Sequence, residues 1–344
     1  MAQYALLILP SSNRVYADAS IALTQAELAA FNRAVLGGRL SAVEPRTIGG
    51  VPYVTFDADH VDERDTAFLA NLSSVYALFE LSGDMLRPIE LRPLDRFDDD
   101  LITIQKYQGK TNEQFTKLLL NVTLLACSAA PEMLERRFRV LDPLCGRGTT
   151  MQQALMYGFD AAGVDRDQKD FEAYAAFIQT WLKRKRIKHK ADFGPVRRNR
   201  QVIAKRLQIE LAAAKDDYKS GEKQQLDVVN VDTVRSGEFF KPESFDLIVT
   251  DLPYGVQHGS RTPGKGLVRS PADLLADALP VWTGLLRRGG AIGIAWNTFV
   301  AKRDEAAELL AKCGLDIVDE DPYQSFRHRV DQAIQRDILV ARKP

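Results

Sequence analysis

The sequence predicts an α/β fold over residues 101–344, preceded by a small α+β domain over residues 1–100. Two observations favour this division. From about residue 139 onward, strand-like apolar runs alternate with helical patterns, and a proline-rich charged segment, 86–100, separates this part from the first. Strands that alternate with helices indicate a mostly parallel sheet with helices on both faces.

Seven strand-like runs support the prediction for the second part. They are 139–144, 161–165, 226–232, 245–252, 291–299, 315–319 and 337–342. A helix is predicted from Thr111, with Thr111 and Gln114 at the spacing of a capping box. We therefore expect a Rossmann-like sheet in this part of the chain.

The first hundred residues contain both strand and helix patterns. Residues 4–9 and 51–56 resemble strands, whereas 24–35 and 67–79 follow helical periodicity. This part has no lysine, 8 arginines and 15 acidic residues, which makes it a poor phosphate binder. We expect it to position a substrate or to stabilise the fold.

The overall composition excludes several classes of protein. Hydrophobic residues make up 45% and charged residues 27%, as in ordinary globular proteins. The three cysteines form no C-x-x-C pair and the four histidines are scattered, which argues against a disulfide framework and a metal site. No signal peptide or apolar membrane span is apparent. We expect a cytoplasmic monomer without metal or membrane partners.

A glycine-bearing turn follows the first strand of the second part, in the stretch Asp142-Pro-Leu-Cys-Gly-Arg-Gly-Thr149. Its glycines let the backbone approach a ligand closely. Ligands of doubly wound sheets bind outside the carboxyl ends of the strands. Because residue 151 is Met and no Gly-Lys-Ser/Thr is present, the turn is neither a dinucleotide fingerprint nor a Walker A loop. The candidate cofactor residues here are Asp142, Pro143, Cys145, Gly146, Gly148 and Thr149.

Acidic residues also end the next two strands. Asp165, followed by Arg166, ends the second strand, and Asp232 ends the third. An acid at the end of the second strand can accept hydrogen bonds from ribose hydroxyls, and Asp232 is positioned to contact an adenine amino group. Although any one of these acids could simply cap a helix, with Asp142 they predict a nucleoside pocket without a diphosphate clamp.

The segment Asp251-Leu-Pro-Tyr254 follows the apolar strand 245–252 and suggests a methyl-transfer site. The amino group of a nucleobase is a poor nucleophile because its lone pair is delocalised into the ring. The Asp251 carboxylate and the Leu252 carbonyl supply acceptors that let this nitrogen rehybridise as a methyl group arrives. Pro253 stiffens the loop, and Tyr254 offers a face on which a base can stack. Asp251 is also a candidate cofactor contact.

These two motifs together resemble those of class I S-adenosylmethionine-dependent amino-methyltransferases. Residues 142–149 resemble the first motif of that family, and Thr250–Gly255 resembles the fourth, usually Asp/Asn-Pro-Pro-Tyr/Phe. Residues 105–344 further resemble tRNA guanine-N2 methyltransferases of the THUMP-associated type, through Gly109–Gln114 and Arg327–Val330. The chain departs from the family pattern in having Leu at position 252 and no clear THUMP domain.

The resemblance implies a seven-stranded methyltransferase sheet with an antiparallel last strand. It also implies S-adenosylmethionine as the cofactor and methylation of guanine N2 in tRNA, with Asp251 and Tyr254 acting on the base. An adenine-N6 methyltransferase of DNA or RNA is the alternative, because the same acceptors serve both bases. A non-catalytic nucleic-acid-binding subunit with a decayed site is a third possibility, against which the intact Asp251 and Tyr254 argue.

A basic segment lies between the second and third strands. Residues 183–206 contain 11 lysines and arginines and one acid, and we expect a basic helical insertion over about 181–223. Such an arm would bind phosphates in a salt-dependent way, although a solvated helix face has a similar composition. The candidate nucleic-acid contacts are Lys183, Arg184, Lys185, Arg186, Arg197 and Arg198, with Arg261 and Lys265 in the loop after the catalytic motif.

Overall fold

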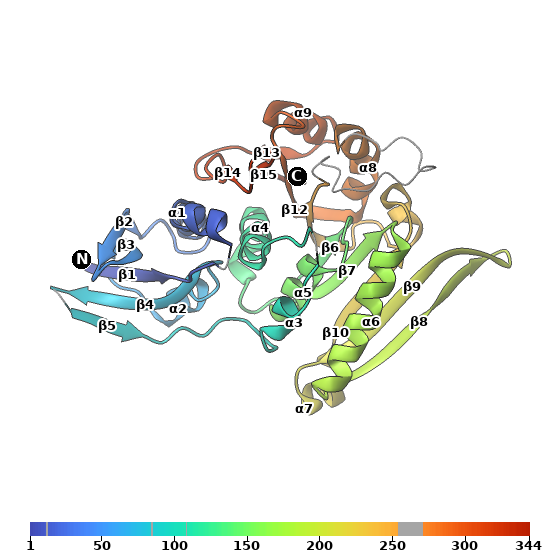
Figure 1. Ribbon diagram of the computed structural model, residues 1–344, viewed down its shortest axis with the longest axis horizontal. Coiled ribbons are helices and arrows are strands. Elements are labelled where there is room, and N and C mark those ends of the chain that lie inside the picture. The colour runs from blue at the N-terminus through green and yellow to red at the C-terminus, as the bar shows by residue number, and fades with distance from the viewer. Residues whose placement is uncertain (12, 84, 108, 254–270) are drawn as a thin grey trace.

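The computed structural model describes residues 1–344 except 12, 84, 108 and 254–270, and it contains two sheets (Figure 1). The N-terminal sheet is antiparallel, with strand order β2-β3-β1-β4-β5. Its elements are β1 (Ala2–Ile8), α1 (Arg14–Ala34), β2 (Ser41–Ile48), β3 (Val51–Ala58), α2 (Glu63–Leu69), β4 (Val75–Ser82) and β5 (Met85–Ile89).

Two predictions in this unit are wrong at element boundaries. The helix predicted over 67–79 ends at Leu69, and β4 follows as the neighbour of the central strand β1. Its side chains are mostly half-buried and do not show the clean alternation that marks a strand. The segment 86–100 is predicted to be a linker because it is rich in proline and charge, but β5 occupies its beginning.

The second sheet has the order β13-β15-β12-β11-β6-β7-β10-β9-β8, and β14 pairs with β15. The strands β6, β7, β10, β11 and β12 run parallel to one another, whereas β15 is antiparallel to β12 and β13. The seven strands from β13 to β10 therefore confirm the Rossmann-like sheet with an antiparallel last strand. Their bounds are β6 (Arg139–Asp142), β7 (Asp160–Asp165), β10 (Gln224–Asn230), β11 (Phe245–Asp251), β12 (Leu286–Asn297), β13 (Asp316–Val318) and β15 (Gln335–Arg342), with β14 at His328–Arg329.

Helices cover both faces of this sheet. On one face lie α4 (Glu113–Ala126), α5 (Thr149–Met156) and α6 (Gln168–Arg184), and on the other lie η2 (Thr233–Glu238), α8 (Pro271–Leu285) and α9 (Arg303–Lys312). The shorter helices are α3 (Asp100–Thr103), η1 (Ala130–Glu132) and α7 (Lys215–Ser220). Among the described helices, none is long and apolar enough to cross a membrane.

The expected helical insertion over about 181–223 is wrong after Arg184. There β8 (Lys188–Arg198) and β9 (Gln201–Ala212) form an antiparallel hairpin that extends the sheet beyond β10. In β9, Leu207, Ile209 and Leu211 are buried at every second position, which is the signal that sequence reasoning missed. Because β8 is the edge strand and most of its side chains are exposed, its composition shows no apolar alternation.

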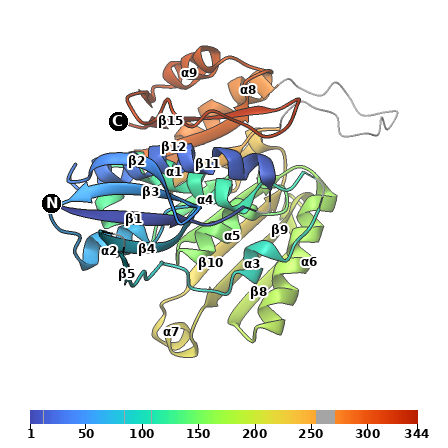
Figure 2. The ribbon, with the colours of Figure 1, turned by 60° about the vertical axis from the view of Figure 1, so that its left-hand side comes forward.

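A buried polar network joins the N-terminal unit to the second sheet. Figure 2 shows the N-terminal unit lying against α4. Between them the Glu27 carboxylate, which is fully buried, accepts hydrogen bonds from the Ser73 backbone N–H and from the Asn121 side chain of α4 at 2.7 Å. Asn121 also donates to the Asn71 carbonyl, and the Tyr157 hydroxyl lies 2.8 Å from the Asn121 oxygen. Such satisfied buried networks fix one relative orientation of the elements that share them.

Candidate active site

A cavity of about 370 Å³ lies at the carboxyl edge of the second sheet, where β6 and β11 are neighbours. Asp142 and Gly146, at the end of β6, line it together with Asp251 and Pro253, at the end of β11. One cavity therefore contains residues from both of the motifs that are far apart in the sequence. The Arg147–Asp170 ion pair, at 2.8 Å, also lines it. The segment before α4 and its first two turns add Tyr107, Gly109, Thr111, Phe115, Thr116 and Leu119.

The turn after β6 requires glycine at position 148. Gly146 and Gly148 have φ angles of +49° and +84°, in the left-handed region that glycine adopts readily. A Cβ atom on Gly148 would also lie 2.4 Å from the ring of Tyr174, which is fully buried. The turn thus holds the backbone close to the cavity, and Thr149 begins α5 directly after it.

Asp142 provides a carboxyl group at the wall of this cavity. It is only 4% exposed, and the Leu144 N–H donates to its Oδ1 at 3.1 Å. Burial raises the pKa of Asp142 to about 7, because the charged form loses its hydration. A cationic ligand in the cavity would favour ionised Asp142, so this residue is suited to bind positive charge.

Asp165 and Asp232 lie at the ends of neighbouring strands, β7 and β10, but neither lines the cavity. The Asp165 carboxylate accepts hydrogen bonds from the N–H groups of Gly146, at 2.8 Å, and Asp167, at 2.7 Å. Burial raises its pKa. The Asp232 side chain accepts from the Val234 N–H and caps η2. Asp165 therefore shapes the glycine turn, and Asp232 has a capping contact.

Of three other predicted cofactor residues, Cys145 lines the cavity and Pro143 and Arg166 do not. The side chains of Pro143 and Cys145 are buried, and that of Arg166 is exposed. Burial raises the pKa of the Cys145 thiol, which keeps it protonated. Cys145 lies where a Cβ on Gly163 would come within 2.8 Å of its sulfur. Its contacts are those of a small packing residue.

Asp251 is held by two residues that sequence reasoning missed. Its Oδ2 accepts a hydrogen bond from the Thr111 hydroxyl at 2.9 Å, and the Arg336 guanidinium lies 3.5 Å away. The Arg336 side chain is 4% exposed, and its guanidinium stacks over the Phe115 ring at 4.1 Å. β15 begins with the polar run Gln335-Arg336-Asp337, so the sequence carries no signal that Arg336 is buried.

The residues around Asp251 are partly described. The Leu252 N–H donates to the Ala295 carbonyl at 2.8 Å, and the Leu252 side chain is buried, which fixes the beginning of the loop. Pro253 is exposed and lines the cavity. Tyr254, Arg261 and Lys265 lie outside the described residues.

The stretch Arg327–Val330 lies behind the cavity wall. The ring of His328 contacts the ring of Phe115, with centroids 5.2 Å apart, and His328 Nδ1 lies 2.9 Å from the Phe326 carbonyl. Burial lowers the pKa of His328 to about 4, so the ring is neutral near pH 7. It therefore supports the aromatic residue on which Arg336 stacks.

The structure separates the predicted nucleic-acid contacts into two groups. Lys183, Arg184, Lys185 and Arg186 lie at the carboxyl end of α6, and Arg197 and Arg198 lie at the tip of the hairpin. In the first group, Lys185 pairs with Asp98 and Asp100, both at 2.7 Å. The basic segment is thus continuous in sequence but divided in space.

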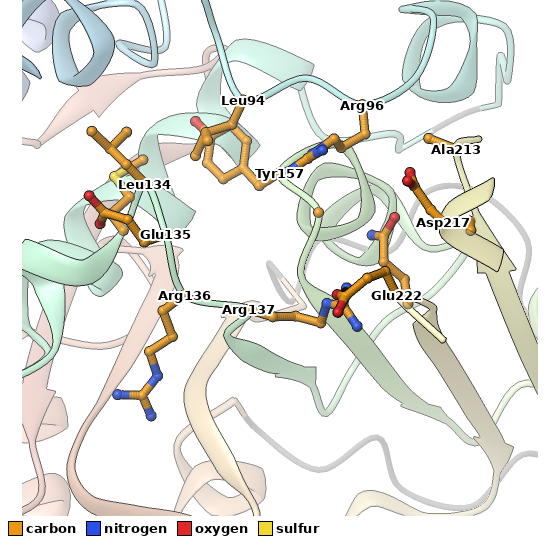
Figure 3. Close-up of a pocket in the computed structure, with 14 residues that line it drawn as sticks. Leu94, Arg96, Leu134, Glu135, Arg136, Arg137, Tyr157, Ala213, Asp217 and Glu222 are labelled. Atoms are coloured by element: carbon orange, nitrogen blue, oxygen red, sulfur yellow. Dashed lines mark hydrogen bonds and ion pairs between the residues drawn. The ribbon is translucent and has the colours of Figure 1, made fainter. Parts of the chain in front are cut away.

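A second polar cavity, of about 500 Å³, lies at the opposite edge of the sheet (Figure 3). Its wall includes Arg136, Arg137 and Glu222, which lie before β6 and before β10. Arg136 pairs with Asp246 at 2.7 Å, and Arg137 pairs with Glu222 at 3.0 Å.

No group of His, Cys, Asp and Glu within the described ranges is arranged to hold a metal ion.

A family model described as "RMKL-like, methyltransferase domain" matches residues 132–283. This range includes the glycine turn, the hairpin and the Asp251 motif. Comparison with curated proteins finds no match.

Solved structures with some similarity include three that cover at least 61% of this chain. A 1,6-didemethyltoxoflavin-N1-methyltransferase from Burkholderia thailandensis is 18% identical, with a TM-score of 0.36 over 61% of this chain and 72% of that one. A TehB-like SAM-dependent methyltransferase from Corynebacterium glutamicum is 16% identical, with a TM-score of 0.33 over 62% and 83%. The protein PH0851 is 10% identical, with a TM-score of 0.42 over 99% and 59%.

The strand order, the glycine turn and the family match agree on one assignment. The parallel strands carry their candidate ligand residues at one edge, in the order expected of a doubly wound nucleoside-binding sheet. The family match spans β6, β7, β10 and β11 of this sheet. The chain therefore has a Rossmann-like sheet, and residues 132–283 match a family of methyltransferase domains.

Proposed function

We propose that this protein methylates the exocyclic amino group of a nucleobase, with guanine N2 in tRNA as the leading substrate. The observation that carries the proposal is the single cavity shared by the glycine turn and Asp251. The choice of guanine and tRNA rests on the resemblance of residues 105–344 described above. Adenine N6 remains the alternative, because an acceptor at Asp251 serves either amino group.

The residues around the cavity fit a nucleoside cofactor that carries positive charge. Asp142 and Asp165 have backbone N–H donors and no cationic side-chain partner within the described part of the chain. Of the carboxylates that line the cavity, Asp170 pairs with Arg147 and Asp251 with Arg336, so Asp142 is the one suited to a sulfonium or ammonium group. In this proposal the backbone of residues 146–148 and Asp142 contact the methionine part. Asp165 and Asp232 lie at the ends of the neighbouring strands beside this cavity, and we assign them to the ribose and the adenine.

S-adenosylmethionine, when bound, supplies an electrophilic methyl group. Asp251 accepts a hydrogen bond from the amino group of the base and draws its lone pair out of the ring. As the N–C bond forms and the S–C bond breaks, the nitrogen becomes positive, and the nearby carboxylate stabilises this charge. The amino proton then leaves through Asp251 to solvent. Thr111 and Arg336 keep the carboxylate oriented throughout.

The test is methyl transfer from deuterated S-adenosylmethionine to unmodified tRNA and to duplex DNA, with nucleosides identified by mass spectrometry. We expect label in N2-methylguanosine from tRNA. Label in N6-methyladenosine would favour the alternative, and label in neither polymer would contradict the proposal. Calorimetry measures S-adenosylmethionine binding by the parent and by Asp165→Ala. If the protein is a non-catalytic subunit with a decayed site, the parent should bind no S-adenosylmethionine.

A further inference from the structure

We propose that the tip of the β8–β9 hairpin binds the phosphate backbone of the nucleic acid whose base enters the cavity at the carboxyl edge. The residues concerned are Arg197, Arg198 and Arg200. The inference rests on the proposed function for the nature of the reacting base. It separates these arginines from the other basic residues of the same sequence segment.

The register of the strands locates the tip at the cavity edge. Asn230, the last residue of β10, pairs with Asp165 on one side and with Lys205 of β9 on the other. Since β9 is antiparallel to β10, its first residue, Gln201, lies four positions beyond Lys205. At about 3.3 Å per residue, the tip extends about 13 Å past the carboxyl ends of the parallel strands. In Figure 1 this end of the hairpin is the one farthest from α7.

The lateral distance to the catalytic strand sets a length for the substrate. Four strand spacings separate β9 from β11, through β10, β7 and β6. At about 4.8 Å per spacing, the tip is about 20 Å from the Asp251 strand. A stacked strand advances about 3.4 Å per nucleotide, so this span corresponds to about six nucleotides. The tip is therefore placed to hold flanking phosphates and not the reacting nucleotide.

The charges at the tip are available to a polyanion. Arg197 and Arg200 are exposed, and within the part of the chain that the structure describes neither has a carboxylate partner. Arg198 is exposed and lies 3.1 Å from Glu238. Val202, paired with Arg197, is 53% exposed and adds an apolar contact for a sugar or base. By contrast, Lys185 at the end of α6 is neutralised by two aspartates.

The turn at the tip has an unusual composition for its geometry. Asn199 and Arg200 have φ angles of +50° and +66°, as in a two-residue hairpin turn with both central residues left-handed. Glycine is the favoured residue at the second position, and a larger side chain there costs about 1 kcal/mol. An arginine in this position presents charge at a small cost in stability, which suits a binding role.

Protection of the sheet edge does not account for these arginines. Lys188, Lys190 and Pro195 lie along β8, where charge and proline discourage pairing with another strand. The tip residues instead cluster at one end, beyond the last pair of β9 with β10. Their position beside the cavity edge calls for a second explanation, which phosphate binding supplies.

The experiment compares two triple variants that remove the same charge. Arg197→Ala/Arg198→Ala/Arg200→Ala changes the tip, and Lys183→Ala/Arg184→Ala/Arg186→Ala changes the end of α6. The probes are a fluorescein-labelled 20-nucleotide single-stranded RNA and the same RNA shortened to four nucleotides, titrated at several NaCl concentrations. With the 20-nucleotide RNA, we expect the tip variant to reduce the slope of log Kd against log salt by about 2. The α6 variant should leave the slope unchanged, and the short RNA should bind both variants alike.

Three results would overturn the inference: no RNA binding by the parent, an unchanged slope in the tip variant, or an equal loss in the α6 variant. Arg197→Lys/Arg198→Lys/Arg200→Lys keeps the charge and should retain the parent slope, which separates charge from folding. Methyl transfer is measured in parallel. A flattened slope without RNA methylation by the parent would remove the proposed function but leave the tip as a phosphate-binding surface. RNA methylation by the parent together with an unchanged slope in the tip variant would support the proposed function but remove the tip as a phosphate-binding surface.

Discussion

The cavities at the two edges of the second sheet differ in charge more than in size. The cavity at the amino edge is larger, about 500 Å³ against about 370 Å³. Two of its arginines pair with carboxylates, Arg136 with Asp246 and Arg137 with Glu222. At the carboxyl edge, Asp142 and Asp165 instead accept hydrogen bonds from backbone N–H groups. Asp142 lines the smaller cavity without a cationic side-chain partner among the described residues, so it is the group there that suits a cationic ligand.

This difference follows from the topology of the sheet. The carboxyl ends of parallel strands meet at one edge, where loops are free to carry function. Burial there raises the pKa of both Asp142 and Asp165, a perturbation typical of functional sites. The carboxyl-edge cavity is the smaller of the two, so strand direction and not volume is the reason to favour it for a nucleoside ligand.

The largest expected effect is the loss of methyl transfer when Asp251 is replaced. Asp251→Ala should reduce methyl transfer by at least about 10³-fold, because the acceptor for the amino group is lost. S-adenosylmethionine affinity, measured by calorimetry, should stay within about tenfold. Asp251→Asn keeps one acceptor oxygen and a partner for the buried Arg336, so it should lose about tenfold to 10²-fold. Equal loss of cofactor binding and turnover in both variants would refute the assigned role.

The next largest effect is on the free energy of unfolding, when one glycine at each edge of the second sheet is replaced. Gly148→Ala places a methyl group 2.4 Å from the buried Tyr174 ring at a φ of +84°, and should cost about 3 kcal/mol in the free energy of unfolding. Gly158→Ala, at the amino-edge cavity, has a φ of +78° but meets only the flexible Arg96 side chain. It should cost about 1 kcal/mol. Urea unfolding measures both, and equal costs would show that the turn at 148 is not specially constrained.

The pH dependence of cofactor binding should reflect Asp142. With its pKa near 7, the ionised form that favours a cation is mostly absent at pH 6. S-adenosylmethionine affinity should therefore rise about tenfold from pH 6 to pH 8. Because the pKa is raised on folding, the stability of the free protein should fall as pH rises from about 4 to about 7. Asp142→Asn should flatten both profiles, and an unchanged binding profile in this variant would point to another titrating group.

The smallest effect is expected at the amino edge. The Arg137–Glu222 pair is solvent-exposed, with side chains 34% and 73% accessible. Arg137→Ala should change the free energy of unfolding by less than about 0.5 kcal/mol and leave methyl transfer unaltered. A large loss of activity would mean that this cavity contributes to function.

Most of the second sheet was predictable from the sequence because its strands are buried runs bounded by turns. The β8–β9 hairpin was not, because its edge strand is exposed and its turn, Asn199-Arg200, lacks glycine. The glycine turn and Asp251 were recognisable as local motifs. Thr111 and Arg336 were not, since their role depends on a contact with Asp251 that links residues 140 and 85 positions apart in the sequence.

The central claim is that the cofactor occupies the carboxyl-edge cavity, and hydrogen exchange with and without S-adenosylhomocysteine tests it most directly. We predict slower exchange of backbone amides over residues 144–150 and 251–252 in the bound protein, with no change over 133–137 and 213–224. Protection confined to 133–137 and 213–224 would place the ligand at the opposite edge and contradict the account.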